Sequence, residues 1–379
     1  MTAPIETTKR TGPSTRDDAL SRAPLVSIVI VTFNSANHIR GCVASVSKGV
    51  GAMPIEQIVI DNASRDGTGA LVRVEFPDVM LVENTVNRGL TAANNQGAEL
   101  ARGRYVVFLN PDTIVPDGTF QTMLGIMERR PDIGVLAPRL VDEMERFNSG
   151  IMGDRAPTAW TVINSFLLLS RLSPDLFPGI LRTKDVAGIE DCDWACGACL
   201  MVRREVTDNF SWGQFGSGDD LDYCLRIGRG GWRVSVTGDA RVVHFGGRSF
   251  TRAKPGTWIG TPSNIARHLL EHGGPVHAAI GIIGMRLGLR LRGAIHYALF
   301  LLTRDPERLY KSNKTRQFLA HDDYAVFRKR TRPAPTSYPR CPAGVSAPTT
   351  ACAPSALSQE AILSRCPAAI PFSGGCMSG

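Results

Sequence analysis

The feature that most constrains the fold is an alternation of apolar, β-branched runs with amphipathic segments in the first third of the chain. Four runs have this character: Leu25–Val31, Gln57–Ile60, a run beginning at Val79, and Val106–Asn110. Each is followed by apolar residues at helical spacing, as at Ile39, Val43 and Val46 after the first run. Strand and helix alternate four times over about 105 residues, which predicts a parallel sheet with helices on both faces.

Polar residues gather directly after the predicted strands. They are Thr32, Phe33 and Asn34 after the first strand, Asp61 and Asn62 after the second, Asn87 and Arg88 after the third, and Asn110 and Asp112 after the fourth. Open parallel sheets bind ligands at the carboxyl ends of their strands, so this edge is the predicted ligand site. A dinucleotide site after the first strand is disfavoured, because the turn TFNSAN lacks the glycines of the G-x-G-x-x-G pattern.

Composition divides the 379 residues into four regions. Residues 1–24 are polar, residues 25–250 hold the alternating pattern, residues 251–330 are basic and apolar, and residues 331–379 are rich in Pro, Ala, Ser and Cys. We expect both terminal regions to be disordered. The nine cysteines are odd in number and no signal-peptide pattern precedes the first strand, so we expect a cytoplasmic protein with reduced thiols.

Three cysteines stand close together in CDWACGAC, at Cys192, Cys196 and Cys199. This spacing raises the possibility of zinc, but no fourth ligand follows at regular spacing. Cysteine also behaves as a small buried hydrophobic residue, and that interpretation is favoured here.

The region 251–330 carries 14 Lys and Arg against 5 Asp and Glu. Within it, an apolar segment from Val276 to Arg304 is interrupted by Arg286, Arg290 and Arg292. So many charges disfavour a transmembrane helix and favour an amphipathic helix lying in the membrane interface. The alternatives are an amphipathic helix packed on the core and a nucleic-acid contact. The second is disfavoured because aromatic residues are not interleaved with the basic ones.

Asp112 is a single carboxylate at a strand end, in the stretch Asn110-Pro111-Asp112-Thr113. Such an aspartate is commonly only a turn residue. Mg²⁺ and Mn²⁺, however, are bound through one or two protein carboxylates when substrate phosphates fill the remaining positions. Asp112 is therefore a candidate metal ligand, provided that a diphosphate and a second ligand converge on it.

A second acidic group occurs in GDDLDYCLR, with Asp219, Asp220 and Asp222. Acids at a helix start are favoured by the helix dipole, and we expect Asp222 to have only that structural role. Two adjacent carboxylates raise each other's pKa and can supply a general base. His244 ends a later β-branched strand beside two glycines, which is a packed position or a ligand position.

Six segments in this order resemble the family 2 glycosyltransferases, and the bacterial rhamnosyltransferase-like branch is the most similar. They are SIVIVTFNS, IVIDNASRDGT, ENTVNRGLTAANNQG, YVVFLNPDTIVPDG, DWACGACLMVRREV and GDDLDYCLRIGRGGWRVSVTGDARVVHFGG. The resemblance covers Leu25 to about Phe250. It implies an α/β fold of the GT-A type, which is a Rossmann-like mixed sheet flanked by helices, here followed by a C-terminal amphipathic helical segment. It also implies a nucleotide-diphosphate sugar donor, Mg²⁺ or Mn²⁺, and inversion at the anomeric carbon.

The resemblance assigns roles residue by residue. The donor-binding positions are Thr32, Phe33, Asn34, Asp61, Asn62, Asn87, Arg88, Gly89, Asn94 and Asn110. Asp112 matches the metal-binding acid of a D-x-D motif whose first acid is Asn110 here, and His244 matches a metal-ligand histidine of some relatives. Asp219 and Asp220 match the catalytic acidic pair, with Asp220 at the position of the base. Trp194 and Gly197 match the loop on the acceptor side.

The sequence thus predicts an inverting glycosyltransferase that is peripheral at the inner face of the plasma membrane. Its expected acceptor is a glycan or lipid-linked glycan of the cell envelope, and no nucleic-acid partner is expected. The alternative is a non-catalytic protein that binds a nucleotide sugar and regulates a partner enzyme.

Overall fold

The computed structural model describes residues 24–49, 53–148, 152–213, 219–245 and 262–320. All of these residues belong to one unit of the chain. The expectations of disorder at 1–24 and 331–379 lie outside the described residues, apart from Pro24.

The amino-terminal half of the sheet is parallel, as predicted. Its strands are β1 (Val26–Thr32), β2 (Ile55–Asp61), β3 (Met80–Glu83) and β4 (Tyr105–Leu109), in the spatial order β3-β2-β1-β4. The connecting helices are α2 (Ala36–Gly49), α3 (Thr68–Glu75) and α4 (Leu90–Leu100). Because all of these strand pairs are parallel, the polar residues that follow them lie at one edge of the sheet.

The remaining strands extend this sheet in mixed directions. They are β5 (Thr113–Ile114), β6 (Ile133–Val141), β7 (Ile189–Cys192), β8 (Cys199–Arg203) and β9 (Arg233–His244). Strand β8 pairs antiparallel with β4, whereas β6 and β9 pair in parallel. The mixed sheet expected from the resemblance is confirmed. The short strand β7 was not predicted, because the sequence indicated only a loop before Ala198.

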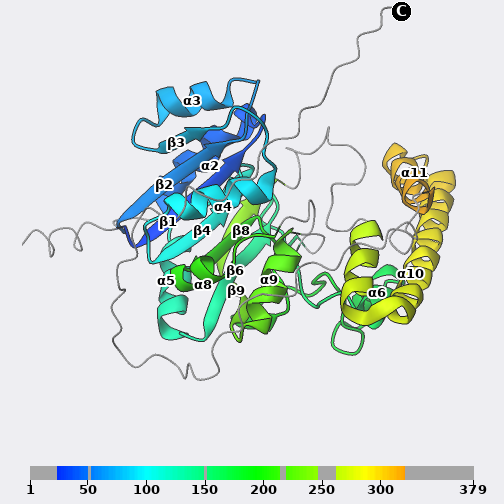
Figure 1. Ribbon diagram of the computed structural model, residues 1–379. Helices are drawn as coiled ribbons and strands as arrows, with labels where there is room; N and C mark the ends of the chain where they lie inside the picture. The colour runs from blue at the N-terminus through cyan, green and yellow to red at the C-terminus, as the bar shows by residue number, and fades with distance from the viewer. Residues whose placement is uncertain (1–23, 50–52, 149–151, 214–218, 246–261, 321–379) are drawn as a thin grey trace, which may run out of the picture. The chain divides into compact units, whose positions relative to one another are not determined.

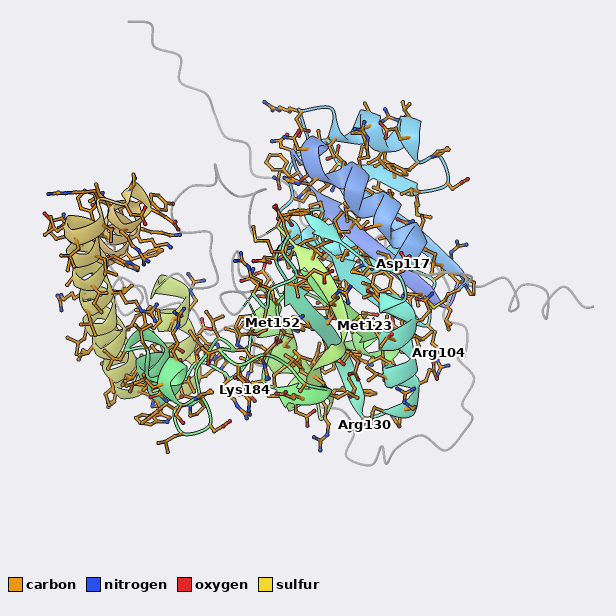
Figure 2. The ribbon with its side chains drawn as sticks, turned by 180° about the vertical axis from the view of Figure 1, so that it is seen from behind. Arg104, Asp117, Met123, Arg130, Met152 and Lys184 are labelled. Carbon is orange, nitrogen blue, oxygen red and sulfur yellow. The ribbon has the colours of Figure 1, made fainter. Side chains whose placement is uncertain are left out.

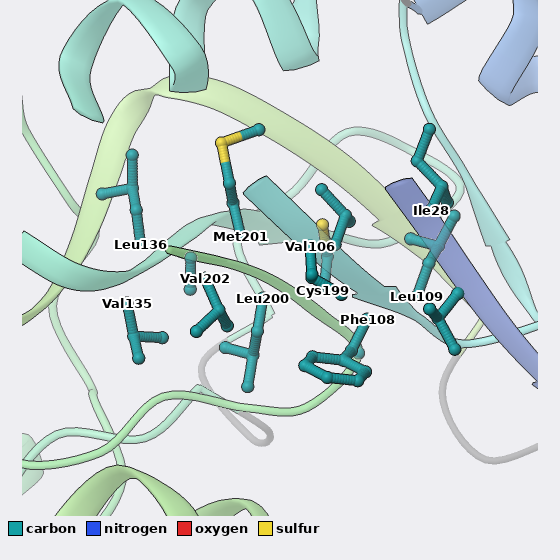
Figure 3. Packing of buried hydrophobic residues seen from close by; sticks show 14 of the residues in the cluster. Ile28, Val106, Phe108, Leu109, Val135, Leu136, Cys199, Leu200, Met201 and Val202 are labelled. Carbon is teal, nitrogen blue, oxygen red and sulfur yellow. The ribbon is translucent and has the colours of Figure 1, made fainter. Parts of the chain in front are cut away.

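Helices cover both faces of the sheet. One face carries α4, α8 (Arg204–Asn209) and α9 (Asp219–Arg229), which Figure 1 shows in front of the strands. The other face carries α2 and α5 (Thr119–Arg129), seen from behind in Figure 2, where Met123 and Arg130 mark α5. Figure 3 shows the core between them: Ile28 of β1, Phe108 of β4, Leu136 of β6 and Cys199 to Val202 of β8. Each fully buried aliphatic side chain of this kind contributes about 1.5–3 kcal/mol.

A second hydrophobic cluster joins the long helix α10 (Pro262–Thr303) to α6 (Ala159–Phe166). Gly274, with φ 77° and ψ 176°, interrupts α10. The sequence did not predict that α6, from within residues 25–250, packs on the C-terminal helices. Two further helices complete this part, α7 (Leu169–Leu172) and α11 (Pro306–Ala320). No helix among the described residues is long and apolar enough to cross a bilayer.

Glycines on α10 permit this close packing. A Cβ at Gly284 would lie 2.3 Å from Cγ1 of Ile163, and a Cβ at Gly288 would lie 2.5 Å from the backbone carbonyl of Phe166. These distances are far below van der Waals contact, so a side chain at either position would clash with α6. The two glycines therefore allow this side of α10 to pack directly on α6.

We expect Gly288→Ala to weaken the packing of α10 on α6 by about 1–3 kcal/mol, because its new methyl group meets backbone that cannot rotate away. Amide hydrogen exchange in α6 and α10 should accelerate accordingly. The matched control is Gly228→Ala on α9, where a Cβ would meet nothing within 4 Å. Unchanged exchange in Gly288→Ala would contradict the close approach.

Candidate active site

The carboxyl ends of β1 and β2 are joined by hydrogen bonds. The backbone N–H of Asn62 donates to the carbonyl of Thr32 at 2.8 Å. Asn34 has a positive φ of 52°, and its side-chain oxygen accepts the N–H of Arg65 at 2.8 Å. Phe33 is exposed beside it. These contacts hold the turn after β1 against the turn after β2.

Asp61, the last residue of β2, is buried and held in one orientation. Its Oδ1 accepts the backbone N–H of Ser64 at 3.1 Å and also the Ser64 hydroxyl. Ser64 was not among the predicted site residues. The Asp-x-x-Ser spacing is the available signal, because Asx turns join an aspartate to polar groups two or three residues later.

A chain of amide side chains connects this turn to the start of α4. The side-chain NH₂ of Asn62 donates to Oδ1 of Asn87 at 2.9 Å, and Oδ1 of Asn62 accepts the backbone N–H of Arg88 at 2.9 Å. Oδ1 of Asn87 also accepts the N–H of Gly89. Arg88 is exposed, whereas Asn94 is buried on α4. The predicted donor-binding residues before α4 thus form one connected group.

Asp112 and His244 meet because β5 pairs antiparallel with β9. Thr113 lies opposite His244 in the register, and the N–H of Phe245 donates to the carbonyl of Asp112 at 3.1 Å. Nε2 of His244 lies 3.4 Å from Oδ1 of Asp112, and both side chains are buried. Burial acts to raise the pKa of Asp112, but the hydrogen bond and charge of His244 outweigh it and hold that pKa below its ordinary value.

The Asp112–His244 pair brings together two side chains of types that can bind a cation. Among the described residues no group of three or more His, Cys, Asp or Glu side chains is arranged to hold a metal. Nδ1 of His244 is buried and has no hydrogen-bond partner within the described chain. Two ligands with open positions suit Mg²⁺ or Mn²⁺ when substrate phosphate oxygens complete the coordination, so these residues fit such an ion.

Asp220 lies in the first turn of α9 and is 6% exposed. Its Oδ2 accepts the backbone N–H of Gly197 at 2.9 Å, and its Oδ1 accepts the N–H of Leu221 at 2.9 Å. Burial raises the pKa of Asp220 to about 6, although both N–H groups act against the shift. A fixed carboxylate with this pKa is suited to accept a proton near neutral pH.

Asp219 has a different environment from its neighbour. Its Oδ2 accepts the hydroxyl of Thr91 at 2.5 Å, and both residues are buried. This contact ties the start of α9 to the start of α4. Thr91 was not among the predicted site residues, because no local pattern joins residues so far apart in the chain. Asp222 pairs with Arg226 at 2.8 Å, which agrees with the structural role expected for it.

The loop before β8 contacts both Asn110, which precedes Asp112, and the catalytic candidate Asp220. The carbonyl of Ala198 accepts the N–H of Asn110 at 2.9 Å, which continues the pairing of β4 with β8. Gly197 adjoins Asp220, since a Cβ there would lie 3.3 Å from the Asp220 Cβ. Trp194 is 2% exposed and donates its indole N–H to the carbonyl of Ile180 at 3.0 Å. The indole of Trp194 therefore packs beneath the loop in the core, and it has no exposed surface for an acceptor to contact.

Cys196 is a further residue of this loop that the sequence analysis did not assign to the site. Burial, and then the negative charges of Asp220 and Asp112, raise the pKa of its thiol above the usual range. The thiol is therefore neutral and lies within electrostatic reach of both carboxylates. Only the fold could reveal this position, because Asp112 and Asp220 are more than a hundred residues apart in the chain.

Comparisons with known proteins show that the chain is similar to glycosyltransferases. The family model described as Glycosyl transferase family 2 matches residues 27–209. The N-acetylglucosaminyl-diphospho-decaprenol L-rhamnosyltransferase of Mycobacterium tuberculosis is 26% identical over 254 residues, which cover 58% of this chain and 76% of that protein. The succinoglycan biosynthesis protein ExoO of Rhizobium meliloti is 37% identical over 101 residues, or 26% of this chain and 29% of that protein.

Among solved structures, one match is the mannosyltransferase PcManGT from Pyrobaculum calidifontis, in complex with GDP-Man and Mn²⁺. It has a TM-score of 0.49 and 18% sequence identity, and the match covers 81% of this chain and 88% of that one.

The raised pKa of Asp220 predicts a pH-dependent stability. A carboxyl group whose pKa rises from 3.8 to about 6 on folding binds more protons in the folded chain between these values, so stability falls as pH rises through that window. We therefore compare the free energies of unfolding of Asp220→Asn and wild type. The difference in favour of the variant should grow by on the order of 2–3 kcal/mol from about pH 4 to neutral pH and then level off.

Urea unfolding across this pH range measures the difference. Asp222→Asn removes a carboxylate from the same helical turn and serves as the matched control. An equal pH dependence in both variants would show that the effect does not arise from the buried carboxyl of Asp220.

Proposed function

We propose that the chain is a family 2 glycosyltransferase that transfers rhamnose from a nucleotide-diphosphate donor to a hydroxyl of a cell-envelope glycan, with inversion. The single observation that carries the proposal is that one loop contacts both parts of the site: the carbonyl of Ala198 accepts the N–H of Asn110, two residues before the Asp112–His244 pair, and Gly197 donates its N–H to the buried Asp220. A diphosphate group at the first and an acceptor hydroxyl at the second would lie on opposite sides of the transferred sugar.

The connected residues at the ends of β1, β2 and β3 would bind the nucleoside. Asp61 and Asn62 present oxygen atoms whose orientations are fixed by hydrogen bonds. Gly89 has a φ of 83° and a Cβ there would meet nothing, so the backbone before α4 is open to a ligand. The exposed Arg88 beside it would contact the diphosphate and neutralise part of its charge.

Asp112 and His244 would hold Mg²⁺ or Mn²⁺ together with donor phosphate oxygens. When bound, such an ion stabilises the negative charge that develops on a departing diphosphate. The chain contributes a buried carboxylate whose pKa is lowered, so Asp112 remains ionised and available as a ligand. His244 would have to release Asp112 or share it, since the two are in contact in the structure.

Asp220 would accept the proton of the acceptor hydroxyl. The acceptor oxygen forms a bond to the anomeric carbon while the bond from that carbon to the diphosphate oxygen breaks, and the electron pair leaves with the diphosphate. The N–H of Gly197 fixes the carboxylate during this step. One displacement without a covalent intermediate inverts the anomeric centre.

The acceptor we propose is a glycan or lipid-linked glycan at the inner face of the plasma membrane, which makes the protein cytoplasmic and peripheral. Two observations support it. The M. tuberculosis relative is named as acting on N-acetylglucosaminyl-diphospho-decaprenol, and the basic character of residues 251–330 suits an anionic surface. The L-rhamnosyltransferase name of the same relative supports rhamnose as the sugar.

Replacing Asp220 by Asn should lower turnover by about 100- to 10,000-fold, because it removes the general base. Donor affinity should remain unchanged, since the isosteric side chain can still accept the N–H of Gly197. Rates of nucleoside-diphosphate release, compared with calorimetric donor binding, measure the two quantities. Donor affinity lost in parallel with turnover would argue against the role of base.

Asp112→Ala should abolish metal-dependent donor binding. Titration of a panel of nucleotide-diphosphate sugars, with and without Mn²⁺, would reveal which donor binds to wild type and whether the ion strengthens that binding. Asp117→Ala, in the turn that follows, is the matched control for loss of one nearby carboxylate. If wild type bound none of the donors, the proposed activity would be overturned and a non-catalytic role would be favoured.

A further inference from the structure

The second half of α10 has two apolar sides, and only one of them is used inside the described chain. Ala278, Ile282, Met285 and Leu289 are buried in the cluster with α6, next to the glycines that admit it. The opposite side carries large apolar residues that are 46% to 73% exposed. They are Val276, Ile280, Ile283, Leu287, Leu291 and Leu301, which we call the outer face of α10.

The outer face is one continuous stripe from Val276 to Leu291, and Leu301 extends it ten residues further along the helix. Successive members from Val276 to Leu291 are three or four residues apart, which places them on the same side of a helix. From Val276 to Leu301 the stripe is about 37 Å long at 1.5 Å per residue. An exposed apolar surface of this extent marks an interaction site in a soluble chain.

The charges around the stripe have one sign. From residue 272 to residue 304 the sequence contains no Asp or Glu and four arginines. Arg286 and Arg292 are engaged within the chain, since they donate to the carbonyls of Leu319 and Phe166 respectively. Arg290 is exposed beside Leu287 and Leu291, and Arg304 is exposed at the end of the helix.

We propose that the outer face of α10 docks on an anionic lipid bilayer, with its apolar side chains at the boundary of head groups and acyl chains and with Arg290 among the head groups. Such helices lie in the plane of the membrane and bind through apolar burial together with attraction to anionic lipids. The inference deepens the proposed function by naming the surface that would bring the enzyme to a lipid-linked acceptor, and it rests on that function for the acceptor alone.

A second copy of the chain would fit this stripe less well. Helix pairs flank an apolar seam with charged residues of both signs, which set register and partner choice. Here the acidic residues are missing over the whole length of the stripe, so two copies would bring cations together without counter-charges. An anionic bilayer supplies the missing charge.

One contact links the docked helix to the site. Nη2 of Arg229, the last residue of α9, lies 3.3 Å from Nδ1 of His272 in the first half of α10. Helix α9 begins with Asp219 and Asp220, so the catalytic helix and the docking helix are in direct contact.

The test is vesicle flotation of the full chain, with phosphatidylcholine alone and with phosphatidylcholine mixed with phosphatidylglycerol. Wild type should bind the anionic vesicles at least about tenfold more tightly than the neutral ones. The triple variant Ile280→Gln, Ile283→Gln, Leu287→Gln should lose about a hundredfold or more in affinity for the anionic vesicles. Arg290→Glu should reduce the preference for anionic lipid by about tenfold.

The matched control carries three substitutions of exposed apolar residues elsewhere, Val74→Gln, Met144→Gln and Leu172→Gln, and should float like wild type. Flotation of the triple variant at the wild-type level, or no flotation of wild type, would overturn the proposal. The proposal would also be overturned if wild type formed a dimer in sedimentation, the triple variant did not, and neither protein bound vesicles. Donor binding, measured separately, distinguishes failure of docking from failure of the proposed activity.

Discussion

The whole arrangement depends on the burial of β1. Every residue of this strand is buried, so its backbone groups must be paired on both sides, and an unpaired group there would cost the protein a large part of its stability. Pairing with β2 on one side and β4 on the other, both in parallel, satisfies that requirement. The same pairing brings Thr32, Asp61 and Asn110 to one edge of the sheet, and the proposed donor-binding group is a consequence of it.

The two carboxylates of the site illustrate how position sets chemistry. Asp112 and Asp220 are both almost fully buried, yet the pKa of Asp112 is lowered by a histidine while the pKa of Asp220 is raised by desolvation. Opposite pKa shifts suit the two acids to the different roles proposed for them, with Asp112 ionised for a cation and Asp220 able to take a proton. The antiparallel β5–β9 pair creates the first environment, and burial in the first turn of α9 creates the second.

The C-terminal helices show a similar division within one helix. Glycines on the inner side of α10 allow α6 to approach, so the large apolar residues of the inner side form a small core. This packing leaves the outer face of α10 to solvent and engages Arg292 with the carbonyl of Phe166, while Arg286 donates to the carbonyl of Leu319 in α11. The arginines that interrupt the apolar sequence therefore have different tasks, which a helical pattern alone cannot separate.

The sequence by itself determined the parallel half of the sheet, because β-branched runs buried on both faces leave few alternatives. It also determined which polar residues follow each strand, and the order of six motifs indicated the family. Only the tertiary structure decided that Asp112 meets His244, that Thr91 binds Asp219, and that Cys196 lies near both carboxylates. The physical reason is that strand pairing and helix contacts between residues distant in the chain create these neighbours, and no local pattern records them. The same holds for Trp194, whose burial against Ile180 follows from packing and not from its motif.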